Sequence, residues 1–475
     1  MLVATFPALA EGVGDGPTIE HHLGQQEIES GTIPLSQLVN DGRRLFAAKF
    51  NRFDGQGRPG TTGGGAPRVS GSAPPFIRTS APDANSCAGC HNDPVVGGAG
   101  DIVANVFVLA QTLDPVTESV SPDFSNERNT LGMQGSGAIE MLAREMTATL
   151  ITTREAAIQQ AKATAMNVTR ELLAKGVSFG SITAKPDGNV DTTQVQGINA
   201  DLIIRPFHQK GVVVSLREFS NNAFNHHHGM QSVERFGQSM TGSHDFDQDG
   251  VSDELTVGDI TAATIYQAAL NIPGQRIPND GPRARAIVRG ERSFARIGCG
   301  SCHVAEMTLD NPVFSEPNPY NPPGNLRPAD VGHSVTFDLT SEGELPRLER
   351  SHDGKAYVRA YTDLKRHNLC DSELTHFCNE KVVQGGVPTG DFITRKLWDV
   401  GSTAPYGHRG DLTTITDAIY YHGGEARTSR DAFFASSDEE RSEVIEFLKS
   451  LQILPAGTPS LVVDENGNRR RAARR

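Results

Sequence analysis

The chain has few of the features that mark a membrane protein or a nucleic-acid-binding protein. No run in its 475 residues approaches the roughly 18 consecutive apolar residues that a membrane-spanning helix needs. Basic residues are in deficit, with 44 Lys and Arg against 57 Asp and Glu, and the formal charge of -13 disfavours binding to nucleic acid. Apolar residues make up only 37%, whereas there are 49 glycines and 27 prolines. We therefore expect a loop-rich globular protein with few long strands, and a chain long enough for two or three domains.

Cysteine is also scarce, and four of the six cysteines lie in two five-residue segments with one pattern, C-x-x-C-H. Two thiols one helical turn apart can form thioethers with the two vinyl groups of a haem, while the next imidazole reaches the iron. A zinc ribbon brings its second cysteine pair within about 15 to 20 residues, whereas about 200 residues separate these two pairs. Each pentad therefore predicts one covalently attached c-type haem. The residues that would hold the two haems are Cys87, Cys90 and His91, and Cys299, Cys302 and His303.

The two remaining cysteines bear on the compartment of the protein. Haem is attached to such pentads outside the bacterial cytoplasm, so we expect a periplasmic or otherwise extracytoplasmic location. There, a disulfide between Cys370 and Cys378 is the default. The start of the chain, Met1 to Ala10, is apolar and ends in Ala-Leu-Ala, which is typical of the last part of a signal peptide with its cleavage site. Its basic beginning is missing, so an internal methionine at position 1 is the alternative.

A second sequence pattern also occurs twice. In the first copy, Pro206-Phe207-His208 and Gly211 precede a capping box that starts at Ser215. In the second, Pro405-Tyr406, His408 and Gly410 precede a cap at Thr414. The capping residue lies four positions after the glycine in both copies. This recurrence indicates a tandem duplication.

The segments before the two pentads match as well, because Gly42-x-Arg44-x-Phe46 corresponds to Gly290-x-Arg292-x-Phe294. The duplication suggests a division of the chain into five parts. These are an N-terminal segment at 1–40, a first haem domain at 41–240, a connection at 241–256, a second haem domain at 257–455 and a basic flexible tail at 456–475.

The repeat also suggests a second ligand for each iron. In an α-helix each residue is rotated by 100° relative to the one before it. Counted from Ile415, the apolar residue after the second cap, His422 points within about 20° of the same direction. Counted from Leu216 after the first cap, His227 also points within about 20°, whereas His226 points about 80° away. We therefore predict His422 for the second haem and His227 for the first. The alternatives are a buried core histidine at 422 and, for His226 to His228, a solvated surface patch, ligation by another member of the triplet, or an open iron.

An acidic segment lies between the two units. Asp245, Asp247 and Asp249 occupy positions 1, 3 and 5 of an EF-hand-like loop, Gly250 occupies position 6, and the Val251 carbonyl and Asp253 follow at positions 7 and 9. This arrangement predicts a calcium ion that fixes the angle between the haem units. Thr256 stands where an EF-hand has its bidentate Glu, and a metal-free acidic turn before a helix from Thr256 is the alternative.

Other elements are expected from periodicity and turn residues. A helix should run from Gly137 to Lys175 and end at Gly176, and strands are expected at Ile102 to Leu109, Val335 to Leu339 and Lys355 to Val358. Asp54 to Asp83 is rich in glycine and proline and should be an irregular loop.

Taken in order, these motifs resemble the bacterial di-haem oxidoreductase family, also described as thiol oxidoreductases. The resemblance runs from about Gly42 to Leu454. Besides the pentads, the residues that carry it are Val177 to Gly180, Arg205 to Phe207, His227 to Gln231, Tyr361 to His367 and Leu397 to Glu425. The family is related to the di-haem cytochrome c peroxidases and to the enzyme that matures tryptophan tryptophylquinone. The resemblance implies a periplasmic, mainly α protein of two tandem cytochrome c-like domains, with long irregular loops and a few short strands.

The resemblance also implies roles for the two haems. In the related peroxidases a ligand of the second haem stands 14 residues after the histidine of a P-Y-x-H-x-G phrase, and His408 plus 14 is His422. The first haem would be the one that meets peroxide, after His227 leaves its iron.

The resulting hypothesis is an oxidoreductase that reduces a small oxidant such as hydrogen peroxide. The His303 haem would take electrons from an external donor, such as a small cytochrome c or a cupredoxin, and relay them to the His91 haem. Cleavage of the O–O bond needs a group that moves a proton, and Glu140 and His228 are the candidates. Arg205 and Arg217 are expected to pair with haem propionates. The alternatives are a non-enzymatic electron-transfer cytochrome and a haem-dependent oxygenase.

Overall fold

The computed structural model describes residues 14–56, 84–100, 103–106, 126–380 and 383–470. The predicted signal remnant and most of the predicted irregular loop at 54–83 lie outside these residues. Within them no helix is both long and apolar enough to span a bilayer.

The helices of the described residues are α1 (Gln25–Glu29), α2 (Leu35–Ala47), α3 (Cys87–Cys90), α4 (Ser136–Thr164), α5 (Leu216–Ala223), the π-helix η1 (Phe224–His228), α6 (Val233–Phe236), α7 (Gln238–Thr241), α8 (Val257–Ala269), α9 (Gly281–Arg296), the 3₁₀-helix η2 (Cys299–Ser301), α10 (Ile415–Tyr420), α11 (Arg427–Ala435) and α12 (Asp438–Ser450), with short 3₁₀ turns at Pro328–Asp330, Thr375–Cys378, Val400–Ser402 and Gly424–Ala426.

The strands of the described residues form small, separate sheets rather than one layer. The sheets are β1 (Val103–Val106) with β2 (Asn126–Asn129); β3 (Val168–Ala174), β4 (Val177–Ala184) and β5 (Val190–Asp191); β14 (Leu451–Gln452), β6 (Gly274–Arg276) and β15 (Val462–Val463); β10 (Glu349–Arg350), β11 (Ala356–Val358) and β7 (Met307–Leu309); β8 (Val313–Glu316) with β9 (Val335–Asp338); and β12 (Arg366–Asn368) with β13 (Asp391–Ile393). With 36% helix and 15% strand, the prediction of a mainly α fold is wrong. Many strands have only two to four residues, too few for an alternating pattern to be recognised.

The first unit is built on the crossing of α2 and α8. A side chain at Gly42 would collide with the carbonyl oxygen of Ala262, so glycine allows the two helix backbones to touch. One turn later, Phe46 packs with its ring centroid 5.3 Å from that of Tyr266 and 6.1 Å from that of His91. The helix crossing therefore positions the histidine of the first pentad.

The second unit repeats this arrangement with α9 and α12. A side chain at Gly290 would collide with the carbonyl oxygen of Glu443. Phe294 lies 6.1 Å from the ring of His303 and 5.5 Å from that of Phe447. In both units, therefore, the glycine of the Gly-x-Arg-x-Phe segment allows a close helix crossing and its phenylalanine packs against the pentad histidine. The packing also places α8 with the first unit, although the sequence-based boundary assigned it to the second.

The Pro-to-Gly segments also fold alike. Residues Phe207 and Val213 form a β-bridge, and Tyr406 and Leu412 form its counterpart. The hydroxyl of Ser215 then accepts the Glu218 N–H to cap α5, and that of Thr414 caps α10. The predicted helix starts are confirmed in both copies.

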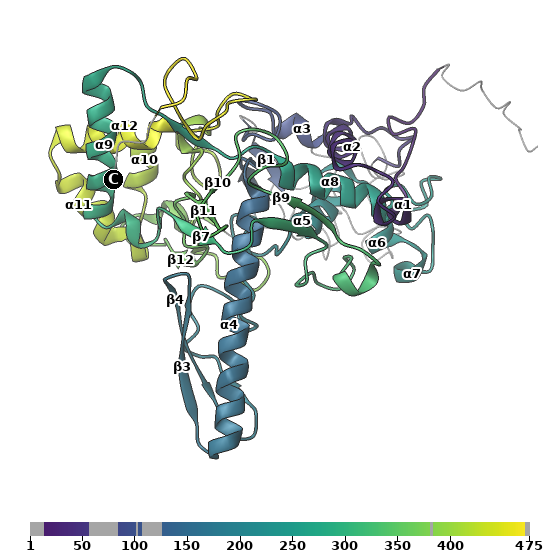
Figure 1. Cartoon of the computed structure of the whole chain (residues 1–475), viewed down its shortest axis with the longest axis horizontal. Helices are drawn as coiled ribbons and strands as arrows, with labels where there is room; N and C mark the ends of the chain where they lie inside the picture. Colours follow the sequence, from purple (N-terminus) through teal and green to yellow (C-terminus); the bar gives the residue numbers. More distant parts are fainter. Residues whose placement is uncertain (1–13, 57–83, 101–102, 107–125, 381–382, 471–475) are drawn as a thin grey trace, which may run out of the picture.

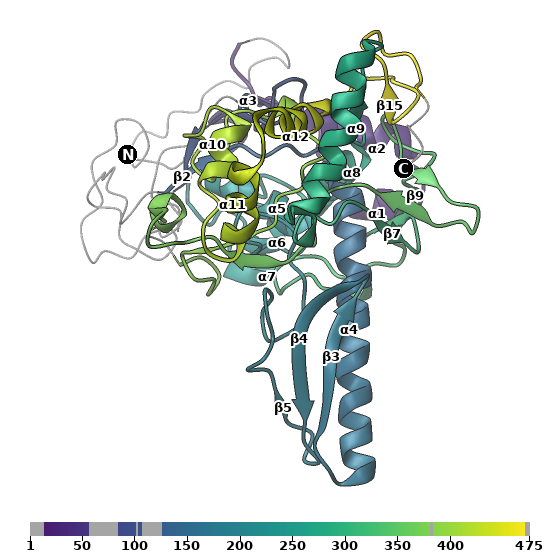
Figure 2. The same cartoon turned by 90° about the vertical axis from the view of Figure 1, so that its left-hand side faces the viewer.

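The long helix α4 projects from the body together with the sheet β3–β4–β5, as Figures 1 and 2 show. The prediction of a helix up to Lys175 is wrong, because α4 ends at Thr164 and the next residues turn back as a hairpin. Lys175 and Gly176 both have positive φ, 46° and 82°, as a two-residue hairpin turn requires. The apolar spacing of Ile139, Leu142, Met146 and Leu150 does follow one buried face of α4.

Several local predictions are confirmed. Strands β9 and β11 lie at the predicted positions, β1 lies inside the predicted strand at 102–109, and Cys370 is disulfide-bonded to Cys378 with a Cα–Cα distance of 4.7 Å. The tail predicted to be flexible is described up to residue 470. In it β15 pairs in parallel with β6 of the second unit.

Candidate haem site

A single cavity of about 420 Å³ joins the two units. Both pentads line it with both cysteines and the histidine, although their first cysteines are separated by more than 200 residues in sequence. None of these four cysteines forms a disulfide, in contrast to the bonded pair at Cys370 and Cys378. The lining is largely apolar away from the pentads, with Phe46, Ile139, Leu216, Phe219, Phe294, Leu364, Ile415 and Leu448 among its residues. This donor set and its apolar surroundings fit two haems.

The pentad histidines are oriented by backbone carbonyls. The Nδ1 atom of His91 lies 3.3 Å from Gly98 O, and that of His303 lies 3.0 Å from Tyr361 O. A carbonyl partner at Nδ1 leaves Nε2 as the atom that can bind iron. Burial lowers the pKa of both imidazoles to about 4, so that both are neutral at pH 7 and able to act as ligands.

Tyr361 in turn is fixed by its surroundings. Its hydroxyl donates to Glu291 Oε1 at 2.8 Å, and its ring packs edge-on against Phe294 and Phe447. Its φ of 52° turns the backbone at this position. Tyr361 is therefore a residue that positions His303. From the sequence it was identified only as part of a motif that carries the family resemblance.

His422 lies where a second ligand of the His303 haem should lie. Its Nδ1 is 2.6 Å from Ala418 O, one turn back, and its half-buried imidazole lines the cavity. Burial lowers the pKa of His422, and the proximity of His422 also contributes to the low pKa of His303. The two imidazoles thus lie close to each other, one from the segment just after α10 and one from the second pentad.

The triplet His226 to His228 lies on the π-helix η1 that continues α5. Of the three, His227 and His228 line the cavity. The charge of His227 contributes to the low pKa of His91, as expected if the two rings share one space. The placement favours His227 as the second ligand of the first haem. The sequence argument had also selected His227, but it assumed an α-helix where the chain forms a π-helix.

The two candidates for proton transfer have other partners. His228 is held by Ala84 O at 2.6 Å from Nδ1, and its Nε2 is 3.3 Å from Cys87 Sγ. Glu140 accepts the N–H of Leu216 at the start of α5 and the amide of Asn318, and it is not among the residues that line the cavity. This placement gives Glu140 a structural task and favours His228 over it for chemistry near the first pentad.

Neither arginine predicted for the propionates lies at the cavity. Arg217 is fully buried and pairs with Glu234 and Glu316, and Arg205 pairs with Asp201. The basic residues that do line the cavity are Arg128, Arg395, Lys396 and Arg430. Carboxylates of bound haems would find their cationic partners there. These residues carry no local sequence signature, because folding alone brings residues 128 and 430 to one space.

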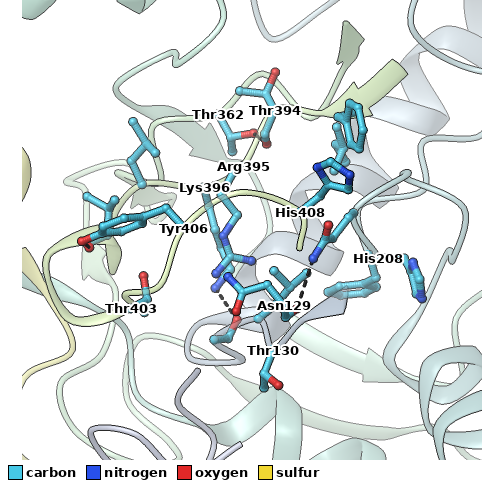
Figure 3. Close-up of a pocket in the computed structure, with 18 of the residues that line it drawn as sticks. Asn129, Thr130, His208, Thr362, Thr394, Arg395, Lys396, Thr403, Tyr406 and His408 are labelled. Carbon is cyan, nitrogen blue, oxygen red and sulfur yellow. Dashed lines mark hydrogen bonds between the residues drawn. The ribbon is translucent and has the colours of Figure 1, made fainter. Parts of the chain in front are cut away.

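Figure 3 shows a part of the cavity lining, with Asn129, Lys396 and His408 among the labelled residues. The ammonium of Lys396 donates to Gly132 O at 2.8 Å and to Asp399, and burial lowers its pKa to about 8. His408 is buried among Phe377, Phe392 and His376, and burial lowers its pKa to about 2. A neutral His408 is therefore a packing residue of the cavity wall and not a charged one.

The Arg217 cluster leads to a prediction about stability. We expect Arg217→Met to destabilise the fold by about 3–5 kcal/mol, because it leaves two buried carboxylates without their counter-charge. Arg205→Met is the matched control, since its partially exposed pair with Asp201 is worth about 0–1 kcal/mol. Thermal unfolding followed by circular dichroism measures both. Equal midpoints for the two variants would contradict the structural assignment of Arg217.

The acidic loop keeps its three leading carboxylates together. Suitable oxygens of Asp245, Asp247 and Asp249 all lie within 4.8 Å of one another. Burial, and then the charges of Asp249 and Asp245, raises the pKa of Asp247 to about 7. Asp253, predicted as a further ligand, pairs with His244 at 2.8 Å instead. Thr256 caps α8 in a capping box with Asp259, as the helix predicted from Thr256 requires.

Two pentads on one cavity, each faced by a further histidine, define a site for two haem groups. Residues 349–451 match the family model described as "Di-haem oxidoreductase, putative peroxidase". The resemblance stated from the sequence is thereby confirmed over this part of the second unit, and the family name implies haem cofactors and a redox role.

Comparison with other proteins adds little to this. No curated protein matches the chain. The hydrazine synthase of Kuenenia stuttgartiensis is 13% identical with a TM-score of 0.36, over 95% of this chain and 99% of that one. A MauG-like protein associated with microbial copper homeostasis is 14% identical with a TM-score of 0.25, over 70% of this chain and 90% of that one.

Proposed function

We propose that the chain is a periplasmic di-haem c-type oxidoreductase of the peroxidase kind. Electrons from an external donor enter at the His303 unit and reach the His91 unit, where hydrogen peroxide or a similar small oxidant is reduced. The observation that carries this proposal is the shared cavity, which is lined by both pentads and in which each pentad histidine is held at Nδ1 by a backbone carbonyl. Haem iron, when bound there, supplies one-electron transfer and O–O bond cleavage.

The chain's own residues would divide the work between the two units. Cys87, Cys90, Cys299 and Cys302 would anchor the haems. His91 and His303, whose Nδ1 atoms are held by the carbonyls of Gly98 and Tyr361, would ligate the irons. His422 sits on a hydrogen-bonded turn, which favours a permanent second ligand. His227 sits on a π-helix, a form of helix often found at functional sites, which favours a ligand that can leave.

His228 is the group that we propose for proton movement beside the first pentad. Its Nδ1 is fixed by Ala84 O, so its Nε2 is the atom available to accept or hold a proton. The first pentad's Cys87 is only 3.3 Å from that atom, which places the imidazole at the edge of the haem site.

A second candidate function rests on the same histidines. Because both pentads are faced by another histidine, both irons could keep two protein ligands, and the chain would then be a di-haem electron carrier without an enzymatic site. His422 and His227 are equally placed to support this reading. The two functions differ only in whether His227 leaves the iron of the first haem, so that an oxidant can bind there.

The negative charge of the chain and of its acidic loop supports a proposed electron donor and a proposed second cofactor. The chain carries a net charge of -13, so a small basic cytochrome c or cupredoxin is the electron donor that we propose. Calcium is the cation that we propose for the acidic loop, because it takes six to eight oxygen ligands and the loop offers clustered carboxylates.

Spectra of the half-reduced protein test the proposal. We expect one haem to become high-spin and five-coordinate when the other is reduced, and to bind peroxide stoichiometrically. His227→Ala should open that haem already in the oxidised protein, whereas His226→Ala, its neighbour outside the cavity lining, should not. Two haems that stay low-spin and never react with peroxide would leave the electron carrier as the function.

A further inference from the structure

One imidazole of the second unit is held between two carboxylates. The Nε2 atom of His367 in β12 lies 2.8 Å from Asp363 Oδ2, and its Nδ1 atom lies 2.8 Å from Glu425 Oε2. Because a neutral imidazole has only one N–H, bonds from both ring nitrogens to carboxylates require the protonated ring. Burial lowers the pKa of His367, but its hydrogen bonds, first of all that to Asp363, raise it to about 11. The ring is therefore an imidazolium with two anionic partners.

The buried partner belongs to the segment that orients the second pentad. Asp363 is 2% exposed and stands two residues after Tyr361, whose carbonyl lies 3.0 Å from Nδ1 of His303. Asp363 and His367 also lie beside the pentad itself, because a ligand atom of each is within 4.8 Å of Cys302 Sγ. Both ring nitrogens of His367 already have carboxylate partners, so this trio is not an open metal site. It places the imidazolium against the pentad.

The exposed partner belongs to the segment that carries the other candidate ligand. Glu425 stands three residues after His422, and both residues line the cavity together with His367. The second carboxylate oxygen of Glu425 accepts the N–H of Asn368, the residue after His367 in β12, at 2.8 Å. A carboxylate that accepts one bond from an imidazolium and one from the adjacent backbone has a fixed orientation. The segment after His422 is thus tied to β12 by two bonds.

Close backbone packing supports the same link. A side chain at Gly424 would collide with the carbonyl oxygen of Asn368, and one at Gly423 would collide with the side chain of Asp371. The N–H of Gly424 donates to Asp371 Oδ2 at 3.2 Å, and Arg427 forms an ion pair with the same carboxylate. The backbone that follows the candidate ligand is therefore packed directly against the end of β12 and the residues after it.

We propose that His367 is a positioning residue that holds the segments of His303 and His422 together in the second haem site. Asp363 is its partner on the first segment, and Glu425 is its partner on the second. Such outer partners orient the ligands of a metal. This proposal rests on the proposed function, because it takes His422 as the second ligand, and it names what keeps that ligand in place. Movement of the His422 segment away from the pentad breaks the bonds of Glu425, so the link keeps the second haem closed.

Truncation of the exposed partner tests the proposal. Glu425→Ala removes the link but leaves the buried pair of His367 with Asp363, and the Glu425 side chain is 54% exposed, so the fold is expected to persist. Cyanide binds a ferric six-coordinate haem only after a protein ligand has left the iron. We therefore expect cyanide to bind the second haem of oxidised Glu425→Ala about three- to tenfold faster than that of the unmodified protein. Glu425→Gln, which removes the charge but keeps one acceptor oxygen, should give a smaller increase.

Two further variants make the result specific. His422→Ala identifies the second haem in these measurements, because it removes that haem's low-spin resonance signal. Glu349→Ala is the matched control, since Glu349 is 46% exposed and pairs with Arg359 in the same unit, outside the segment that carries the candidate ligand. It should bind cyanide at the rate of the unmodified protein. Glu425→Ala and Glu349→Ala should both retain two haems and unfold at about the same temperature, because each loses one partly exposed ion pair.

The outcomes separate this proposal from the function on which it rests. If His422→Ala loses a low-spin signal but Glu425→Ala binds cyanide no faster than Glu349→Ala, then His422 stays assigned as a ligand and the role of His367 is overturned. Faster binding at the first haem instead of the second would overturn that role as well. If His422→Ala changes neither signal, the ligand assignment itself fails, and the proposal fails with it.

Discussion

Replacing His422 with alanine is expected to convert one of the two haems from low-spin to high-spin. The imidazole is half-buried, lines the cavity and is oriented by Ala418 O, which leaves its Nε2 for the iron opposite His303. Alanine offers no ligand atom and leaves a gap that only a water molecule could fill. We therefore expect the low-spin signal of one haem to disappear from the electron paramagnetic resonance spectrum while that of the other remains.

His352→Ala is the control for this variant. His352 is exposed and does not line the cavity, so its loss should leave both haem signals unchanged. A His422→Ala protein whose absorption and resonance spectra match those of the unmodified protein would remove His422 from the ligand set. The segment that follows α10 would then no longer be assigned as the source of the second ligand in the second unit.

Gly290→Ala is expected to have the largest effect on the second unit's stability. The added methyl group would collide with the carbonyl oxygen of Glu443 and force α9 away from α12. Overpacking of this kind costs about 1–3 kcal/mol when side chains can adjust, and a backbone atom adjusts least. Because Phe294 lies between that crossing and His303, the shift should also loosen the haem. Thermal unfolding and haem retention measure the two effects.

The same substitution at the start of the same helix provides the control. At Gly281 the added methyl group meets only the flexible end of the Arg285 side chain, at 3.1 Å, and alanine favours the helix. Gly281→Ala should therefore unfold at the same temperature as the unmodified protein or slightly above it. A Gly290→Ala protein as stable as Gly281→Ala would show that the two helices do not cross at this glycine.

Much of the candidate site could be predicted because short local signals specify it. The pentads need only five residues each, the helix caps at Ser215 and Thr414 need three or four, and the disulfide needs two cysteines with no other task. The repeated Gly-x-Arg-x-Phe segments marked the equivalent helices α2 and α9 before their partners were known.

What could not be predicted depends on contacts between distant residues. The sequence gives Arg217 a positive charge but not the two buried carboxylates that surround it, at positions 234 and 316. Likewise, the apolar spacing of α4 could not reveal that the chain would reverse at Lys175 and Gly176, where turn chemistry overrides helical periodicity. The basic residues of the cavity come from three separate parts of the chain, and only the fold gathers them.

The membership of α8 shows the same limit. Its sequence follows the acidic loop directly, which suggested a start of the second unit. Instead, its backbone at Ala262 lies so close to Gly42 of α2 that a side chain at position 42 would collide with the Ala262 carbonyl oxygen. The position of a linker in the sequence therefore does not show which unit the helix after it packs against.

The most direct test of the central claim is the intact mass of the purified protein together with its metal content. Two thioether-bound haems predict a mass that exceeds the polypeptide by two haem groups, two irons per chain, and the pyridine haemochrome spectrum of c-type haem. A protein that carries no covalent porphyrin, or that holds zinc on Cys87, Cys90, Cys299 and Cys302, would contradict the account.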